Sequence, residues 1–198
     1  MAVITKGRQI QDRDSIGGIK AVFVVIDASE NANEAVLFDS GNTTRSGNQI
    51  TDFEDGTYEA LQFDVLRGSG GFTQSVEGSI ENGTYSFNMS LEFTLHKIDE
   101  ATQDAIEALA KTRATLFVLD NNDNVLCAGL GNGMEMVGGS FQTGAGYGEL
   151  NGSTLTFEGR EITPAPFLIP TAGAGTTNYP FDNVPSGATP TVLYTASA

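Results

Sequence analysis

The sequence predicts an α+β fold made mainly of β-strands, in which antiparallel, barrel-forming sheets pack as a sandwich beside one helix. Three observations support this prediction. Residues 85–95 alternate apolar and polar side chains, which is typical of a strand with one buried face. The first 163 residues contain no proline, a residue that is scarce inside paired strands. Only one stretch, 100–111, combines helix-forming residues with a single apolar stripe.

The strands before the central hairpin are predicted from apolar runs and the turns that separate them. Residues 20–27 form an almost continuous apolar run, typical of a strand buried on both faces. A short apolar segment at 35–38 lies between turn-forming stretches at 31–33 and 39–48. Residues 58–66 alternate less regularly but offer a core face, so we expect another strand there.

A β-hairpin is predicted over 72–80 and 84–95, because Glu81-Asn82-Gly83 lies between the two alternating runs. Asn-Gly favours a type I′ turn, in which both central residues take a positive φ. One face of the second strand is entirely apolar and is expected to enter the core: Tyr85, Phe87, Met89, Leu91, Phe93 and Leu95.

The helix is expected at about 100–111, with Asp99 as its N-cap and acidic residues in its first turn. Asp120 to Asn124 supply a polar turn after it. Strands are predicted on both sides of this turn and up to the first proline, over 114–119, 125–130, 134–137, 139–148 and 153–162, the last two joined through Asn151-Gly152.

The chain divides into a body, residues 1–163, and a C-terminal arm, residues 164–198. All six prolines lie between 164 and 190, and Asp182 is the arm's only charged side chain. Such a segment cannot fold alone, so we expect an extended arm laid on another surface, with a flexible tail as the alternative. Its apolar residues favour the arm: Phe167, Leu168, Ile169, Tyr179, Phe181, Val192, Leu193 and Tyr194.

The composition excludes several classes of protein. The chain has 25 acidic and 10 basic residues, a net charge of −15, which argues against binding to a phosphate backbone. The single cysteine excludes internal disulfides and multi-cysteine zinc sites, and the single histidine excludes sites that need two imidazoles. The longest apolar run, 21–26, is far shorter than the ~20 residues that cross a bilayer. Without a secretory apolar segment near residue 1, we expect a soluble protein made without export.

The motifs that resemble chemical sites do not support one. The turn at Asp120–Asn124 lacks the glycine and glutamate of a calcium loop, because Val125 and Gly131 stand at those positions. We interpret it as a hairpin turn, with calcium binding as a minor alternative.

Two glycine-rich segments, 129–133 and 144–148, are followed by strand-like sequence instead of the helix that a nucleotide loop requires. We expect bulges or turns there. A Cys127–His96 nucleophilic pair is disfavoured, because a lone cysteine in an apolar run usually packs as a small hydrophobe. We assign no catalytic residue, no cofactor or cofactor-binding residue and no metal ligand.

The order of elements is similar to that of a known family. The strand at 82–95 leads into a helix at 101–110 and a hairpin at 114–130. The strand Asn151-Gly-Ser-Thr-Leu-Thr-Phe-Glu-Gly-Arg-Glu161 then closes the body, with a proline shortly after it. Over residues 19–166 this arrangement resembles bacteriophage tail tube proteins and the related inner-tube proteins of contractile injection systems.

The resemblance implies a virion structural protein without enzymatic activity. Protomers would close into rings, usually hexamers, in which the inner sheets of neighbours join into a continuous β-barrel. Stacked rings would form a tail tube in the phage particle. The implied partners are copies of the chain itself and other virion tail or portal proteins, with no membrane. DNA would pass as cargo without specific binding. A loop matching residues 39–56 often makes ring-to-ring contacts in that family.

The negative charge suggests an acidic conduit. We assign four glutamates to the polar faces of the predicted strands and expect them to repel DNA phosphates if those faces line a lumen: Glu77, Glu81, Glu92 and Glu158. Acidic charge that only keeps the protein soluble is an equal alternative. Other expectations remain open: a tail terminator, collar or capsid decoration protein, or a β-sandwich module that binds a small ligand or a carbohydrate.

Overall fold

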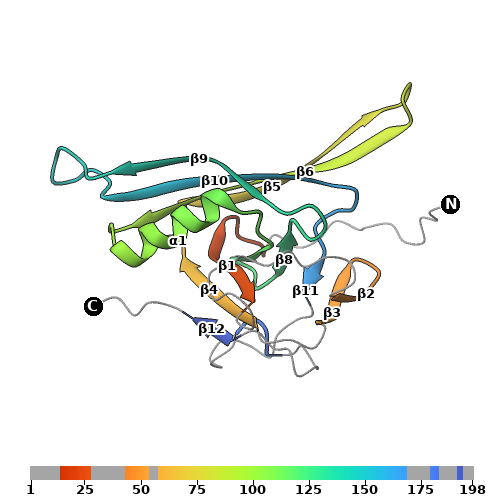
Figure 1. The fold of residues 1–198 in the computed structure, drawn as a ribbon, viewed down its shortest axis with the longest axis horizontal. Helices are drawn as coiled ribbons and strands as arrows, with labels where there is room; N and C mark the ends of the chain where they lie inside the picture. Colours follow the sequence, from red (N-terminus) through yellow and green to blue (C-terminus); the bar gives the residue numbers. More distant parts are fainter. Residues whose placement is uncertain (1–13, 28–42, 54–57, 169–178, 183–190, 194–198) are drawn as a thin grey trace.

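The computed structural model describes residues 14–27, 43–53, 58–168, 179–182 and 191–193, and within them it confirms a mainly β fold with one helix (Figure 1). The elements follow one another in this order: β1 (Ile19–Asp27), β2 (Thr43–Ser46), β3 (Gln49–Phe53), β4 (Tyr58–Asp64), β5 (Gly70–Ser79), β6 (Thr84–His96), α1 (Glu100–Lys111), β7 (Leu116–Asp120), β8 (Val125–Ala128), β9 (Glu135–Gln142), β10 (Gly152–Glu161), β11 (Phe167–Leu168) and β12 (Thr191–Leu193).

The strands form two sheets. The smaller sheet has the order β5-β6-β10-β9 and is antiparallel throughout. The larger sheet has the order β12-β4-β1-β7-β8-β11-β3-β2 and is mixed, because β11 runs parallel to β3 and β12 runs parallel to β4. These two parallel pairs depart from the predicted antiparallel arrangement, which the other strand pairs follow. Over the residues that the structure describes, neither sheet is closed into a barrel.

The first core fills the space between the two sheets and beneath α1. Alternate residues of β6 point into it, and Met89, Leu91, Phe93 and Leu95 are buried as the alternation predicts. The expectation is wrong for Tyr85, which is exposed because it lies near the hairpin tip, beyond the rest of the core, and Phe87 is only partly buried. Helix α1 covers one end of this layer with its apolar stripe, from which Ile106 and Leu109 are buried. The helix begins and ends at the predicted residues, and its N-cap residue makes no side-chain capping bond. No helix in the described residues is long and apolar enough to cross a membrane.

A second core lies on the opposite face of the larger sheet. Strand β1 separates the two cores: Val22 and Val24 face the first, and Phe23 and Val25 face the second. The prediction of a strand buried on both faces is thus confirmed. The centre of the second core is Phe181, whose ring packs edge-to-face on Phe23 and on Phe117.

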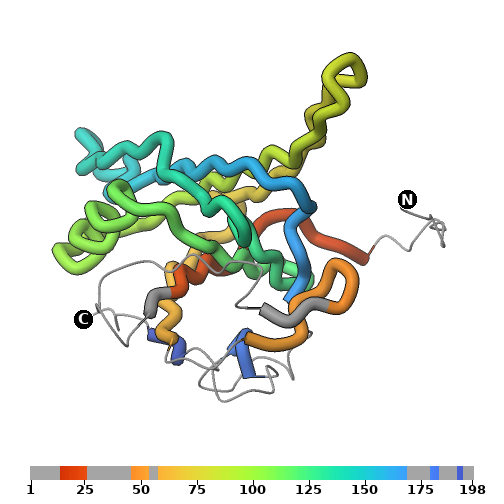
Figure 2. Tube along the Cα trace, turned by 45° about the vertical axis from the view of Figure 1, so that its right-hand side comes forward, coloured from red at the N-terminus to blue at the C-terminus, as the bar shows by residue number. Residues whose placement is uncertain are grey.

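The described parts of the predicted arm pack against their own chain. Phe167 pairs with Gln49 of β3 and with Leu126 of β8, and Val192 of β12 pairs with Ala60 of β4. Figure 2 shows these C-terminal pieces beside segments from the first third of the chain. The residues after 163 thereby supply two strands of the larger sheet.

Three local predictions are corrected. The hairpin of β5 and β6 forms, but residues 80–83 make a four-residue loop in which only Gly83 has a positive φ, because Ser79 pairs with Thr84. The strands expected at 134–137 and 139–148 are one strand, β9, with a bulge opposite the Thr156–Phe157 step.

The described part of the stretch 39–56 also differs from the expected loop, because it forms the antiparallel pair β2 and β3. The apolar segment expected at 35–38 lies outside the described residues.

Candidate functional site

The outward face of the smaller sheet is lined by polar side chains. Residues on this face alternate with the core residues of each strand, and the strand register aligns them in rows, such as Thr73–Ser90–Glu158 and Thr94–Thr154–Ser140. We call this surface the polar face, and its members are Thr73, Ser75, Glu77, Asn88, Ser90, Glu92, Thr94, Glu135, Ser140, Thr154, Thr156, Glu158 and Arg160.

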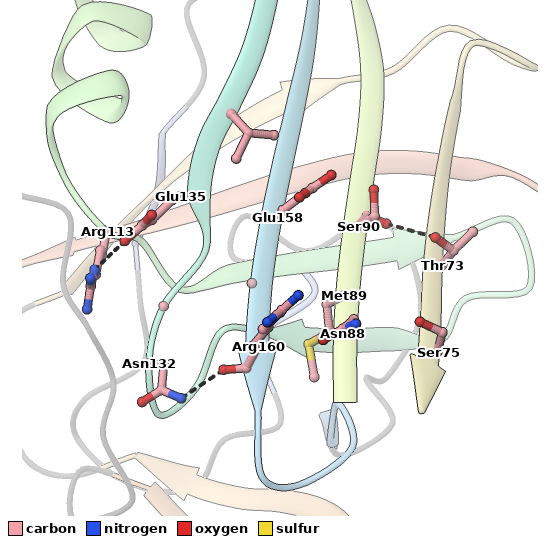
Figure 3. A pocket seen from close by; sticks show the side chains of 13 residues that line it. Thr73, Ser75, Asn88, Met89, Ser90, Arg113, Asn132, Glu135, Glu158 and Arg160 are labelled. Carbon is pink, nitrogen blue, oxygen red and sulfur yellow. Dashed lines mark hydrogen bonds and ion pairs between the residues drawn. The ribbon is translucent and has the colours of Figure 1, made fainter. Parts of the chain in front are cut away.

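A shallow hollow of about 530 Å³ lies on the polar face and extends to Arg113 and Asn132 (Figure 3). The Oδ1 atom of Asn88 is buried here and has no hydrogen-bond partner among the described residues. Asn132 donates to the carbonyl of Arg160 at 2.8 Å and holds the end of the hollow in place. The hollow offers hydrogen-bonding groups without an aromatic platform.

Carboxylates outnumber basic groups on the polar face, which carries four glutamates and one arginine. Arg113 Nε and Glu135 Oε1 are 2.6 Å apart, and Arg160 Nη2 and Glu77 Oε2 are 3.8 Å apart. Within the described ranges, Glu92 and Glu158 have no ion-pair partner. The structure therefore brings Glu77, Glu92 and Glu158, three of the four glutamates proposed for a conduit, onto one face.

The fourth, Glu81, lies instead in the loop at the tip of the hairpin. Its backbone belongs to the four residues between the paired Ser79 and Thr84, so it is outside the rows of the polar face.

Both edges of the smaller sheet are long and unpaired in the described part of the chain. The edge strands β5 and β9 have 10 and 8 residues, and neither contains lysine or proline. By contrast, β12 and β2 at the edges of the larger sheet have only 3 and 4 residues. Proteins that stay monomeric usually shorten, charge or cover their sheet edges. A bulge is a further device of this kind, and β9 has one; β5 has no bulge and carries a single charged residue, Glu77.

The glycine-rich loop at 129–133 binds a carboxylate of its own chain. Glu161 is only 7% exposed, and its Oε1 accepts hydrogen bonds from the backbone N–H groups of Gly131 at 2.9 Å and Asn132 at 2.7 Å. Consecutive N–H groups in such a loop form a concavity that holds an anion. A side chain already fills the concavity, so the loop is not a nucleotide cradle.

Replacing Glu161 with alanine should lower the free energy of unfolding by about 2–3 kcal/mol, because two N–H groups would lose their acceptor in a buried place. Glu161→Gln retains one oxygen acceptor and should cost about half as much. Urea unfolding of both variants and the parent measures this difference. An unchanged midpoint for Glu161→Ala would show that water replaces the carboxylate without cost.

The second glycine-rich loop follows the same pattern. Glu149 Oε2 accepts a hydrogen bond from the backbone N–H of Ala145 at 2.6 Å, and this bond, with a second from Gly146, lowers the pKa of Glu149. Gly144 takes a positive φ where the chain turns. Both loops are therefore turns organised around a glutamate of the same chain, in agreement with the prediction of bulges or turns.

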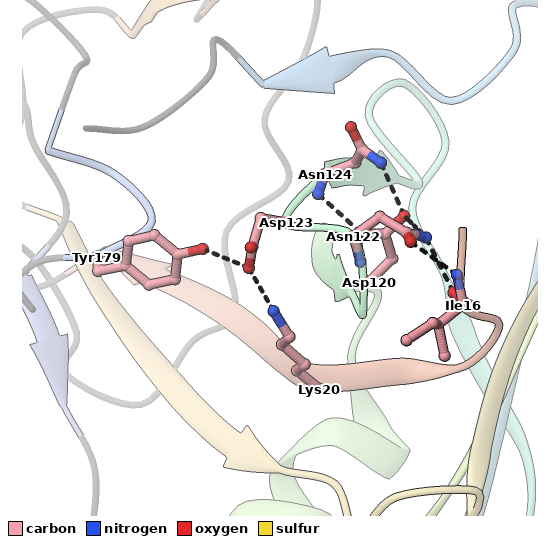
Figure 4. A network of polar contacts seen from close by, with 7 residues as sticks. All are labelled: Ile16, Lys20, Asp120, Asn122, Asp123, Asn124 and Tyr179. Carbon is pink, nitrogen blue, oxygen red and sulfur yellow. Dashed lines mark hydrogen bonds and ion pairs between the residues drawn. The ribbon is translucent and has the colours of Figure 1, made fainter. Parts of the chain in front are cut away.

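The acidic turn after β7 anchors other segments (Figure 4). Asp120 Oδ1 accepts from the backbone N–H groups of Asn122 at 2.8 Å and Asn124 at 2.7 Å. The side chain of Asn122 exchanges two hydrogen bonds of 2.9 Å with the backbone of Ile16. Asp123 accepts from Lys20 and, at 3.3 Å, from the hydroxyl of Tyr179. The described residues contain no cluster of three or more potential metal ligands.

The pKa of Asp123 is lowered mainly by the hydrogen bond from Lys20. A carboxyl whose pKa is lower in the folded than in the unfolded state stabilises the fold above its unfolded pKa. Asp123→Asn should therefore cost up to about 1 kcal/mol at pH 7, since both partners are largely exposed. The cost should disappear as the pH falls below the ordinary value of 3.8 and through the folded pKa.

Urea unfolding of the parent and the Asp123→Asn variant, at pH 7 and at about pH 3, measures this pH dependence. Asp14→Asn is the matched control, because it removes an exposed carboxylate that forms no ion pair within the described ranges. A cost of Asp123→Asn that stays constant with pH would exclude the ion pair as its origin.

His96 and Cys127 do not form a site. Cys127 is fully buried in the second core, on β8 of the larger sheet. His96 is exposed at the end of β6, in the other sheet. The two side chains therefore lie in different layers of the fold.

Sequence reasoning missed the polar face as a unit, and it missed Glu135, Arg113 and Arg160 as members or neighbours of it. The alternation of β6 and β10 indicated each polar row separately. Only the register between the strands shows that the rows are continuous.

Comparisons with protein-family models, with curated proteins and with solved structures find no match to the chain.

Proposed function

We propose that this chain is a structural subunit that assembles with copies of itself into rings, usually hexameric in the family that it resembles, which stack into a phage tail tube or tail ring. The observation that carries the proposal is the smaller sheet, which has two long edges and a polar face that no described residue pairs with or covers. An enzyme would need a set of reactive groups, and the residues gathered on this face are suited to contact and solvation.

The directions of the edge strands are compatible with such a ring. Four antiparallel strands alternate in direction, so β5 and β9 run in opposite directions. If β9 of one copy is placed beside β5 of the next, the antiparallel order continues without interruption. A rotation repeated around an axis then removes every free edge of the smaller sheets, which is the physical advantage of ring closure.

The polar face would then line the conduit. Its short hydroxyl and amide side chains leave space, and its glutamates exceed its arginines. With a net charge of −15 per chain, an assembled wall would repel the phosphates of passing DNA. On this proposal the partners are other copies and further virion tail or portal proteins, and the location is the virion.

Electron microscopy of the purified chain in negative stain tests this proposal, together with sedimentation at increasing concentration. We expect rings or hollow stacked polymers. A salt concentration of about 0.5 M should favour them, because it screens the repulsion between acidic copies. A chain that remains a monomer at every concentration and salt level would contradict the proposal.

A second candidate function, binding of a small polar ligand or a carbohydrate, is favoured by the hollow beside Asn88 and its unpartnered Oδ1 atom. It predicts a monomer whose melting temperature rises with a mono- or disaccharide. An Asn88→Ala variant should lose that rise, and a melting temperature that no sugar changes would contradict this candidate.

A further inference from the structure

The exposed apolar side chains are concentrated at opposite edges of the smaller sheet. Eleven large apolar residues are exposed in the described part of the chain, and six of them lie on the β5–β6 hairpin or on β9 and the turn after it: Val76, Ile80, Tyr85, Val137, Phe141 and Tyr147. Scattered single residues need no explanation, but a concentration at two edges of one sheet indicates a contact surface.

The first group lies under an overhang. The β5–β6 hairpin extends beyond the rest of the fold (Figures 1 and 2). Val76 and Tyr85 occupy core-side positions, in line with the buried Leu91 and Phe93, but no part of the described chain covers them. Tyr85 packs edge-to-face on Phe87 with ring centres 6.2 Å apart, which gives the underside a continuous apolar surface.

The second group lies along the opposite edge. Phe141 stands across from Ser153, which is buried, so Phe141 is on the core side of β9 at its open edge. Val137, at the bulge of the same strand, lines the hollow on the polar face together with Ser90 and Glu158. Both groups therefore flank open edges of one sheet.

The stagger of the strands relates the two groups. Strand β5 pairs with residues 84–93 of β6, whereas β9 lies, through β10, opposite residues 90–96. Relative to β9, β5 is therefore displaced toward the hairpin tip, by three residues at one end of the strand and by six at the other. At ~3.4 Å per residue this is roughly 10–20 Å. A copy whose β9 follows β5 is displaced toward the tip by the same amount.

We infer that the underside of the β5–β6 overhang is a docking surface for a second copy of this chain. The β9 edge of that copy, with Phe141 on its core side, covers Val76 and Tyr85. This inference rests on the proposed assembly through the sheet edges. It adds the side-chain contact that determines which edge of one copy meets which edge of the next. The contact is head-to-tail, because the two surfaces differ and each copy carries one of each.

Two variants test this contact. The hairpin variant carries Val76→Ser and Tyr85→Ser, and the edge variant carries Phe141→Ser. All three side chains are between 49% and 65% exposed, so each monomer should fold with an unchanged circular dichroism spectrum. We expect the concentration needed for assembly, measured by sedimentation, to rise about tenfold or more for each variant.

Mixing the two variants distinguishes a head-to-tail contact from any other. The hairpin variant retains an intact β9 edge, and the edge variant retains an intact overhang. An equimolar mixture should therefore form a heterodimer and stop there, because the remaining surfaces of the pair are the substituted ones. A mixture that stays monomeric, or homodimers of either variant alone, would overturn the inference.

Two controls complete the experiment. Leu66→Ser with Ile162→Ser removes two similarly exposed apolar side chains elsewhere and should leave assembly unchanged. Val76→Ile with Tyr85→Phe keeps the apolar surface and should assemble like the parent. If the parent assembles and the hairpin variant assembles equally well, this inference alone fails. If the parent never assembles, the proposed function fails with it.

Discussion

Replacing Phe181 with alanine should lower the free energy of unfolding by about 3–5 kcal/mol, because the ring is completely buried at the centre of the second core. Its centroid is 5.3 Å from that of Phe117 and 5.5 Å from that of Phe23, in edge-to-face geometry, and 6.3 Å from that of Phe53. Domains of this size are stable by only about 5–15 kcal/mol, so the variant should be close to its unfolding threshold at 37 °C.

Chemical unfolding of the purified variant measures this loss, with Phe167→Ala as the matched control. Phe167 also follows residue 163, but its side chain is 44% exposed, so its removal should cost about 1 kcal/mol or less. Equal losses for the two variants would show that Phe181 contributes no more than a surface ring.

The position of Phe181 explains how the residues after 163 relate to the body. Their composition indicated an arm with apolar anchor points, and the prediction left open which surface they would occupy. The sequence contains no local signal for this choice, because Phe181 packs against Phe23 and Phe117, which are more than 60 residues away. Phe181, Leu168 and Val192 complete a core of the same chain.

Local patterns predicted elements better than they predicted connections. The alternation of β6 indicated its core face correctly, since a strand has a period of two residues. Asn82-Gly83 indicated a hairpin but not its loop, because the pairing of Ser79 with Thr84 decides how many residues remain between the strands. The pair β2–β3 was missed because its polar sequence carries a turn composition.

The candidate site depends on long-range pairing to a still greater degree. Glu92 and Glu158 are each visible as a polar residue on a strand, yet their shared face follows from the register that pairs Glu92 with Thr156 and Glu158 with Ser90. The open edges are also invisible in the sequence, because the strand order of a sheet determines which strands are outermost.

Gly152→Ala should destabilise the fold by about 3 kcal/mol, because a methyl group at this position would lie 2.0 Å from the carbonyl oxygen of Leu95. Asn151-Gly152 was interpreted as a turn signal, but Gly152 is the first residue of β10 and has an ordinary backbone conformation. The glycine is required by the close approach of two backbones, where β10 begins to pair with β6. Its loss should separate the two central strands of the smaller sheet.

The matched control for this prediction is Gly71→Ala in β5, where an added methyl group meets nothing within 4 Å. That variant should be neutral or more stable by about 0.5 kcal/mol, since alanine loses less conformational entropy than glycine in a strand. Urea unfolding compares the two, and equal effects would mean that strand propensity outweighs crowding. Because β6 and β10 carry the centre of the polar face, Gly152→Ala should also prevent assembly. Gly71→Ala should leave the fold intact, so any change in its assembly would come from the β5 edge.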